Sequence, residues 1–364
     1  MSASFDPATV HERLAHVKWL IGSWKSVEGE VMYPTMKEPV KIIEILEISH
    51  KGNPVFNYRT RTINAGTGQP MYEKEGFIMV SDQPEDHTTV ALLLVHANGV
   101  AEISEGTVDV NAKSMELHSN MNKIQTPSFV PQSATQMKRT IQRTDDDTLV
   151  QTLQMATPTT ELTDLLKTAF KLRLLSVRNA SIMSFDQASF DPTSVHERLA
   201  HVKWLIGNWK SVEGEVMYPT MKEPVKIIEI LEISHKGNPV FNYRARAINA
   251  ETGKPMHEEE GFIKVSKQPE DHTTVALLLA HANGVADISE GTVDVNAKSM
   301  ELHSHMNKIQ TPSFVPQTVT QMKRVIQRTD DDTLVQTLQM ATPTTELTDH
   351  IRTVFKLISI HVHL

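Results

Sequence analysis

The chain repeats itself almost completely, and this repetition limits its architecture more than any other feature. The segment FDPATVHERLAHVKWLIGSW, which begins at Phe5, returns as FDPTSVHERLAHVKWLIGNW at Phe190, an offset of 185 residues. The alignment continues without a gap to Lys171 and Lys356, and over this stretch the two copies differ at 21 positions. A period of this length indicates a duplicated domain, since solenoid repeats measure about 20–50 residues. We therefore predict two domains of one fold, at residues 5–180 and 190–364.

Each copy has the pattern of a β-rich fold. Residues 10–21 carry apolar side chains at spacings of 4, 3 and 4, which predicts an N-terminal helix. Short apolar and β-branched runs follow, such as 40–49 and 88–97, and Asn98-Gly99 after the second of these is a hairpin signal. Strands at this spacing without alternating helices are typical of antiparallel sandwiches or barrels. We predict an all-β chain of two tandem antiparallel up-and-down β-barrels of the lipocalin or fatty-acid-binding-protein type, because closure removes sheet edges.

A short helix is also expected near the C-terminal end of each copy. In the second copy TTELTDHIRTVFKL, at 344–357, has an apolar face that includes Ile351 and Val354, and His350 lies on that face. The first copy has Leu165 at the position of His350. Two interpretations of His350 stay open. It is either a core histidine satisfied by a hydrogen bond or a ligand to iron or another metal, since neutral imidazole is a preferred donor.

A second exchange to histidine occurs in the same copy. Met256-His257 stands where the first copy has Met71-Tyr72. Both exchanges flank segments that can face the inside of a barrel, which favours the metal-ligand interpretation. Asn120 also becomes His305, however, with no evident role, so coincidence stays open as an explanation.

Composition excludes several classes of protein. A formal net charge of -8 argues against a bulk binder of nucleic acid or of anionic membranes. No apolar run reaches the length of about 18 residues that indicates a membrane span. The start of the chain lacks a basic segment followed by an apolar one, so we expect a cytoplasmic or nuclear location. The chain has no cysteine, which excludes disulfides, thiolate zinc sites, iron–sulfur clusters and cysteine nucleophiles.

The common catalytic motifs are absent from the sequence. There is no phosphate-binding loop, no dinucleotide-binding glycine motif and no nucleophile elbow. His11 and His16 lie five positions apart, about 140° around a helix, whereas a zinc-protease motif needs a spacing of four. His361 and His363 would share one face of a terminal strand, which permits weak metal binding, but an exposed chain end explains them better.

Longer stretches resemble a known family. The sequence WLIGNW at 204–209 is similar to the W-L-x-G-x-W opening of the nitrobindins, which are small haem-binding β-barrels. Tyr218-Pro219-Thr220, PMHEEEGFIKV, ANGVADISEGTV and QMATPTTELTDH follow in the family's order, and the resemblance covers nearly all of each copy. It implies a barrel of about ten strands that holds ferric haem b through one axial histidine. It also implies isomerisation of peroxynitrite to nitrate and binding of nitric oxide.

The resemblance assigns roles to particular residues. The family's axial histidine falls on His350 and its haem-contacting threonine on Thr220, while its pocket-lining positions fall on Met256, His257, His281 and Met340. The first copy matches with Thr35, Met71, His96 and Met155 but has Tyr72 and Leu165 at the two histidine positions. Since leucine does not ligate iron, the resemblance implies one haem per chain, in the second domain. His350 would then be both the iron ligand and the catalytic residue.

One stretch departs from the family pattern. The family's G-x-W-x-G-x-G is represented by Gly207-Asn-Trp209-Lys-Ser211-Val-Glu213, and the first copy shows the same loss of glycine at Ser26 and Glu28. Glycines of this kind permit a tight, closely approaching backbone. We therefore expect a different loop at the mouth of the pocket and an altered access for substrate.

Two other functions stay open at this point. A barrel with an apolar cavity is suited to carry a fatty acid or another apolar ligand without catalysis. The first domain, without the imidazole, fits this carrier interpretation better than a haem site. Alternatively, the first domain serves as a covalent substitute for a homodimer partner, so that the two domains form a pseudo-dimer.

Overall fold

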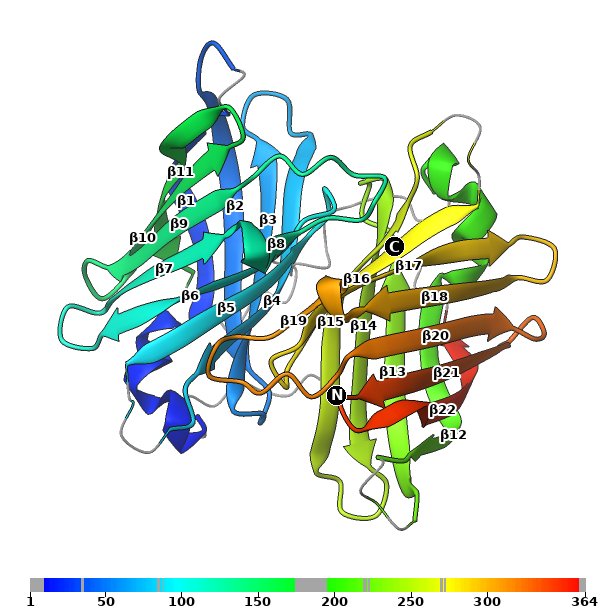
Figure 1. Cartoon of the computed structure of the whole chain (residues 1–364). Helices are drawn as coiled ribbons and strands as arrows, with labels where there is room; N and C mark the ends of the chain where they lie inside the picture. Colours follow the sequence, from blue (N-terminus) through cyan, green and yellow to red (C-terminus); the bar gives the residue numbers. More distant parts are fainter. Residues whose placement is uncertain are drawn as a thin grey trace. The chain divides into compact units, whose positions relative to one another are not determined.

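In the computed structural model the chain forms two compact units, each a closed β-barrel (Figure 1). The structure describes residues 10–173 and 195–359, apart from 34–35, 84–85, 87, 219–220, 222, 269–270 and 272. Thr220, Thr35, His361 and His363 lie outside the described residues. Among the described helices, none is long and apolar enough to cross a membrane.

The first unit is an antiparallel barrel of ten strands with one further strand of two residues, β8. Strands β1 and β11 pair, as do β5 and β6, so the sheet closes on itself. Its elements are η2 (Glu12–Leu20), β1 (Gly22–Val31), β2 (Val40–His50), β3 (Val55–Asn64), β4 (Pro70–Val80), β5 (Thr89–His96), β6 (Ala101–Asp109), β7 (Ser114–Asn120), η3 (Met121–Lys123), β8 (Ile124–Gln125), β9 (Gln136–Arg143), β10 (Thr148–Thr157) and β11 (Thr160–Leu172).

The second unit repeats this topology. Here β12 pairs with β22 and β16 with β17, which again closes the sheet. Its elements are η4 (Glu197–Leu205), β12 (Gly207–Val216), β13 (Val225–Ser234), β14 (Val240–Asn249), β15 (Pro255–Val265), β16 (Thr274–His281), β17 (Ala286–Asp294), β18 (Ser299–His305), η5 (Met306–Lys308), β19 (Ile309–Gln310), β20 (Gln321–Arg328), β21 (Thr333–Thr342) and β22 (Thr345–Ser359). The predicted pair of tandem antiparallel β-barrels is confirmed.

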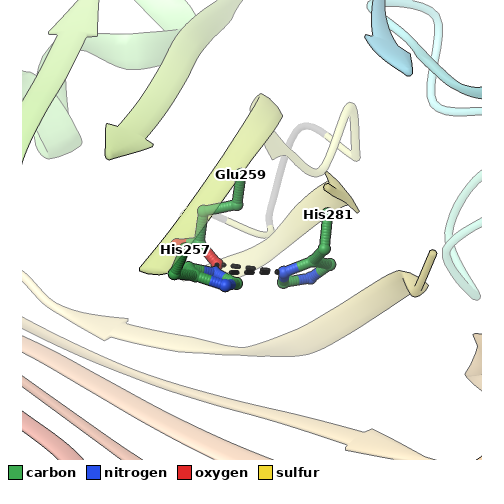
Figure 2. Close-up of side chains that lie close together, drawn as sticks. All are labelled: His257, Glu259 and His281. Carbon is green, nitrogen blue, oxygen red and sulfur yellow. Dashed lines mark hydrogen bonds and ion pairs between the residues drawn. The ribbon is translucent and has the colours of Figure 1, made fainter. Parts of the chain in front are cut away.

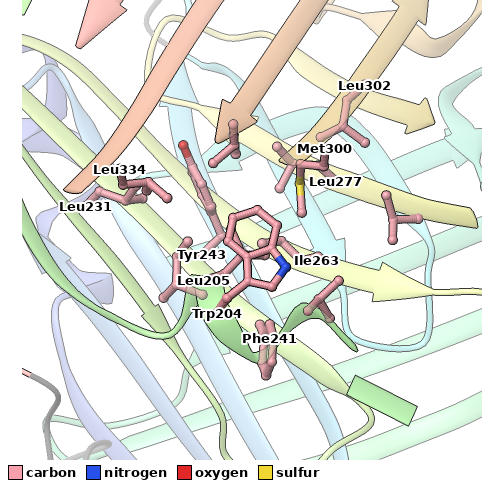
Figure 3. Packing of buried hydrophobic residues seen from close by; sticks show 14 of the residues in the cluster. Trp204, Leu205, Leu231, Phe241, Tyr243, Ile263, Leu277, Met300, Leu302 and Leu334 are labelled. Carbon is pink, nitrogen blue, oxygen red and sulfur yellow. The ribbon is translucent and has the colours of Figure 1, made fainter. Parts of the chain in front are cut away.

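An apolar core fills part of each barrel, and the N-terminal helix contributes to it. The predicted helix is present in each copy, as a 3-10 helix rather than an α-helix. In the second unit the side chain of His196 caps η4 by accepting a hydrogen bond from the backbone N–H of Arg198. Trp209 is fully buried beside this helix, and its indole Nε1 donates to the carbonyl of Leu205 at 3.0 Å. Helix and strand side chains therefore form a single cluster, in which Leu231 also lies (Figure 3).

Truncation within this cluster should destabilise the second unit. Leu231 is completely buried, so Leu231→Ala removes apolar contacts and leaves a cavity, at an expected cost of about 2–5 kcal/mol. Val212 is exposed in the same unit, and Val212→Ala should change the free energy of unfolding by less than about 0.5 kcal/mol. Urea unfolding of the full chain measures both variants. Equal stability of the two variants would contradict this assignment of the core.

The predicted late helix is wrong, because the segment forms the long strands β11 and β22. The error has a physical cause in a β-bulge. Leu338 pairs with Ile351, but the next residue of β21, Gln339, pairs with Asp349, so His350 is an extra residue without a partner in the ladder. A bulge changes which face of a strand receives alternate side chains. Among the buried residues of β22, His350 and Thr353 are three positions apart and Thr353 and Phe355 two apart, an irregular spacing that resembles the period of a helix.

The glycine-poor stretch predicted to alter a loop also lies in a strand. Residues 207–216 form β12, which pairs with β13 on one side and β22 on the other. Its pairing with β22 shifts register between Ser211 and Glu213. The expected difference in a loop at the pocket mouth is therefore wrong for these residues, because they belong to the barrel wall.

Candidate functional site

A layer of buried polar side chains crosses the inside of the second barrel. Arg324, on β20, is 3 % exposed, and its guanidinium donates to both carboxylate oxygens of Glu259 on β15, at 2.7 and 2.9 Å. The hydroxyl of Tyr243 donates to Glu259 Oε1 at 2.8 Å. Burial raises the pKa of Glu259, but the charge of Arg324 and the neighbouring imidazoles outweigh this effect, so its pKa lies well below the usual range. Glu259 is therefore a fixed negative charge.

Two histidines contact the same carboxylate. His257 Nε2 lies 3.1 Å from Glu259 Oε2, and His281 Nδ1 lies 3.3 Å from that oxygen (Figure 2). The two imidazole nitrogens are 3.4 Å apart. On its other side, His281 Nε2 donates to Asp287 Oδ1 at 2.7 Å. The structure thus brings together the predicted pocket residues His257 and His281.

A tight turn places His281 and Asp287 opposite each other. Strand β16 ends at His281, and the backbone N–H of this residue donates to the carbonyl of Val285 across the turn. Gly284 within the turn has φ of 93°, a left-handed conformation that glycine adopts without a steric penalty. The hairpin predicted from Asn98-Gly99 in the first copy is confirmed, since β5 pairs with β6. The equivalent hairpin of the second copy, β16–β17, carries His281 and Asp287.

His350 lies in a separate, more apolar environment. Its side chain is held by the bulge in β22, it is 8 % exposed, and the Tyr218 ring packs against the imidazole with centroids 4.5 Å apart. Nδ1 donates to the carbonyl of Met217 at 3.1 Å, which leaves the lone pair on Nε2. Burial lowers the pKa of His350, and the Met217 carbonyl only partly opposes this effect. The imidazole is therefore neutral near pH 7.

The predicted methionines lie in two apolar clusters rather than in the polar layer. Met256 packs on a cluster that contains Val216 and Ala247, and Met340 packs on a second cluster, around Met322 and Leu338. Ile351, next to His350 in the chain, packs on both clusters. His257 is also close enough for its charge to affect the pKa of His350. The methionines thus share their surroundings with the chain neighbour of His350, and His257 links that environment to the polar layer.

Sequence reasoning missed the carboxylates and the arginine of this region. A signal was present, because Glu259 replaces Lys74 two positions after the exchange of Tyr72 for His257, on the same face of the strand. Asp287 replaces Glu102 as well. Strand alternation would have grouped 257 with 259. Their link to Asp287 and Arg324 depends on contacts between distant strands, which spacing in the sequence does not give.

The first unit pairs the equivalent arginine differently. Arg139 donates to Glu102 Oε1 at 2.8 Å, and Lys74 occupies the position that Glu259 has in the second unit. Burial lowers the pKa of Lys74 to about 8, with Arg139 adding to the effect. In the second unit the carboxylate that binds the arginine therefore lies on β15, whereas in the first unit it lies on β6. The carboxylate at the β6 position of the second unit is the shorter Asp287, which binds His281 instead.

A small cavity lies in the first unit, in the region that matches the surroundings of His350. Its volume is about 60 Å³, and Tyr33, Tyr72 and Leu165 are among its lining residues. The Tyr33 and Tyr72 rings contact each other with centroids 5.8 Å apart. Ligand pockets usually measure about 300–1,000 Å³, so this cavity gives no support to the carrier interpretation. Leu165, which stands at the position of His350, is one of the residues that line this cavity.

Lys74 gives the first unit a characteristic pH dependence. Its pKa of about 8 lies below the ordinary lysine value of 10.5, which applies in the unfolded chain, so the unfolded state holds the proton more tightly. Stability therefore rises as the pH increases from about 8 towards 10.5, by an amount on the order of 3 kcal/mol. Urea unfolding of the full chain and of Lys74→Met at pH 7 and pH 10 tests this. A stability difference between the two proteins that does not change with pH would contradict the prediction.

Comparisons with known proteins agree with this architecture. The family model described as "THAP4-like, heme-binding beta-barrel domain" matches the chain twice, at residues 13–171 and 198–356. "Peroxynitrite isomerase THAP4" of Homo sapiens is 32 % identical over 188 residues, which cover 51 % of this chain and 31 % of that protein. "Peroxynitrite isomerase 1" of Mycolicibacterium paratuberculosis is 34 % identical over 164 residues, which cover 45 % of this chain and 96 % of that protein.

A solved structure is also similar. The crystal structure of Rv2717c from M. tuberculosis shares 28 % sequence identity, covers 46 % of this chain and 100 % of its own, and gives a TM-score of 0.41. The relative from Mycolicibacterium paratuberculosis, which is covered over 96 % of its length, corresponds in length to one of the two barrels. By contrast, the chain spans less than a third of the length of the human relative.

Proposed function

Because the chain belongs to the family of THAP4-like, haem-binding β-barrel domains, we propose that its second unit binds one ferric haem b through His350 and isomerises peroxynitrite to nitrate. The family membership agrees with the resemblance to nitrobindins. Nitric oxide is proposed as a further ligand of the same site. The observation that carries the proposal is the geometry of His350, a buried imidazole on a bulge with its Nδ1 already bound.

The residues around His350 fit an iron ligand. A metal-bound histidine usually donates its other ring N–H to a carbonyl or a carboxylate, which fixes the ring and the tautomer. Met217 provides such a carbonyl, so Nε2 keeps its lone pair. The lowered pKa keeps the imidazole unprotonated, and only the neutral form can bind iron. Leu165 in the first unit has neither property, which restricts the proposal to the second unit.

The side chains of this region have different roles in the proposed site. His350 holds the cofactor, and Tyr218 and Met217 fix the imidazole. Met256 and Met340 supply apolar surface that excludes water. The iron of a bound haem would supply the electrophilic centre for the rearrangement of peroxynitrite, which conserves all its atoms. His257, which is partly exposed, offers a polar group at the edge of this pocket.

Replacement of His350 tests the proposal directly. The full chain should bind one haem, with a Soret band in a haem titration, and should convert peroxynitrite to nitrate. His350→Leu copies the first unit, so it should fold normally but lose haem binding and nitrate production together. His303→Leu is the matched control, because that histidine is only partly buried and pairs with Glu301 on the same strand, β18. Unchanged haem affinity and spectrum in His350→Leu would overturn the proposal.

The first unit provides a gain-of-function test. Since the two copies differ at few positions, Leu165→His combined with Tyr72→His should give the first unit the imidazole ligand and the neighbouring histidine. We expect the variant chain to bind a second haem, measured as haem per chain by titration. If the stoichiometry stays at one although the variant folds, these two residues are not sufficient, and other differences such as Lys74 exclude haem from the first unit.

A further inference from the structure

We propose that the second unit also carries a binding site for a divalent metal ion of the zinc type, separate from the haem ligand His350. The ligands are His257 Nε2, Glu259 Oε2 and His281 Nδ1 (Figure 2). Among the residues that the structure describes, this is the one group of three or more metal-ligating side chains whose ligand atoms lie within 4.8 Å of one another.

The three ligand atoms form a triangle of the size that a zinc ion requires. Zinc binds histidine nitrogen and carboxylate oxygen at about 2.0–2.2 Å in tetrahedral geometry, which places neighbouring ligand atoms about 3.3–3.6 Å apart. The observed separations are 3.1 Å between His257 and Glu259, 3.3 Å between His281 and Glu259, and 3.4 Å between the two histidines. Two of the three separations lie within this range, and the third is about 0.2 Å shorter.

The contacts of His281 leave one of its ring nitrogens for a cation. Nε2 donates to Asp287 Oδ1 at 2.7 Å, so this nitrogen is already occupied. Nδ1 lies 3.3 Å from Glu259 Oε2 and 3.4 Å from His257 Nε2, so it is the nitrogen that a metal ion held by the three groups would bind.

Neighbouring side chains hold the ligands in position, as they do in known zinc sites. A carboxylate that accepts from a metal-bound histidine orients the ring, and Asp287 has this position. Ser289 donates to the other oxygen of Asp287 at 2.8 Å. Tyr243 and Arg324 donate hydrogen bonds to Glu259, and one of the Arg324 bonds is to Oε2 itself. These bonds fix the orientation of the carboxylate before a metal ion binds. The Arg324 charge offsets that of Glu259, and Asp287 restores one negative charge.

The composition of the site points to zinc chemistry with one open position. Two histidines and a glutamate are the protein ligands of some catalytic zinc sites, in which water takes the fourth position. The side chain of His257 is 21 % exposed, so solvent reaches this corner of the triangle. A ligand with an oxygen or nitrogen donor can therefore replace the water.

The first unit lacks this set of ligands. Tyr72 and Lys74 replace two of the three ligands, and only His96 is retained. The Lys74 side chain also contributes a positive charge near His96 and Glu102, as its effect on the pKa of His96 shows. A buried ammonium group thus provides in the first unit the kind of charge that the metal ion provides in the second.

Metal analysis of the full chain tests the proposal. The chain is dialysed against Zn²⁺ and then against metal-free buffer, and zinc and iron are counted in the same sample by mass spectrometry. His361→Ala and His363→Ala in all samples remove the terminal histidine pair. We expect one zinc per chain, lost in His257→Tyr, which copies the first unit. Asp287→Asn should weaken zinc binding about 10- to 100-fold, since it removes only the partner of a ligand.

Two further variants separate this site from the haem site and from misfolding. His350→Leu should lose iron but keep one zinc per chain. Tyr72→His with Lys74→Glu and Glu102→Asp should create a second zinc site in the first unit, a gain that damage to the fold does not produce. Substoichiometric zinc in the starting chain, or zinc retention that is unaffected by His257→Tyr, would overturn the proposal.

Discussion

The buried arginine at the centre of each barrel is the constraint on which the surrounding site depends. A guanidinium group without water must have a carboxylate partner, because an unpaired buried charge costs several kcal/mol. In the second unit this partner is Glu259, and in the first it is Glu102. The residue that binds the arginine determines which contacts the remaining acidic group makes. When Glu259 binds the arginine, Asp287 is available to orient His281, and the histidine pair can form beside the carboxylate.

The bulge in β22 has a comparable role for His350. An extra residue in the strand turns this one side chain into the barrel while its neighbours keep their places in the sheet. The backbone contributes as well, since the Met217 carbonyl binds Nδ1 and the Met217 N–H donates to the carbonyl of His350. The first unit has the same bulge with Leu165 at the extra position. The scaffold for an iron ligand is therefore present twice, and the ligand itself once.

The sequence was sufficient for the fold and for part of the site. Duplication, strand spacing and the hairpin at Asn98-Gly99 predicted two antiparallel barrels because these signals are local. The comparison of the copies singled out His350 and His257 without any structure. The late helix failed because a bulge breaks the regular alternation by which a strand is recognised. Glu259 and Arg324 were missed because strands far apart in the chain bring them together, and only the closed barrel shows this.

The exchange of carboxylate partners links positions that must change together. A barrel that combined Lys74 with Asp287 would leave its arginine facing a shorter acid, and one that combined Glu259 with Glu102 would place a longer acid beside the histidine that Asp287 binds in the second unit. Recombination between the coding sequences of the two repeats would produce both hybrids when the crossover falls between the codons for these two positions. Each hybrid would separate the acid that binds the arginine from the acid length that fits the rest of the site, so the two exchanges function as a pair.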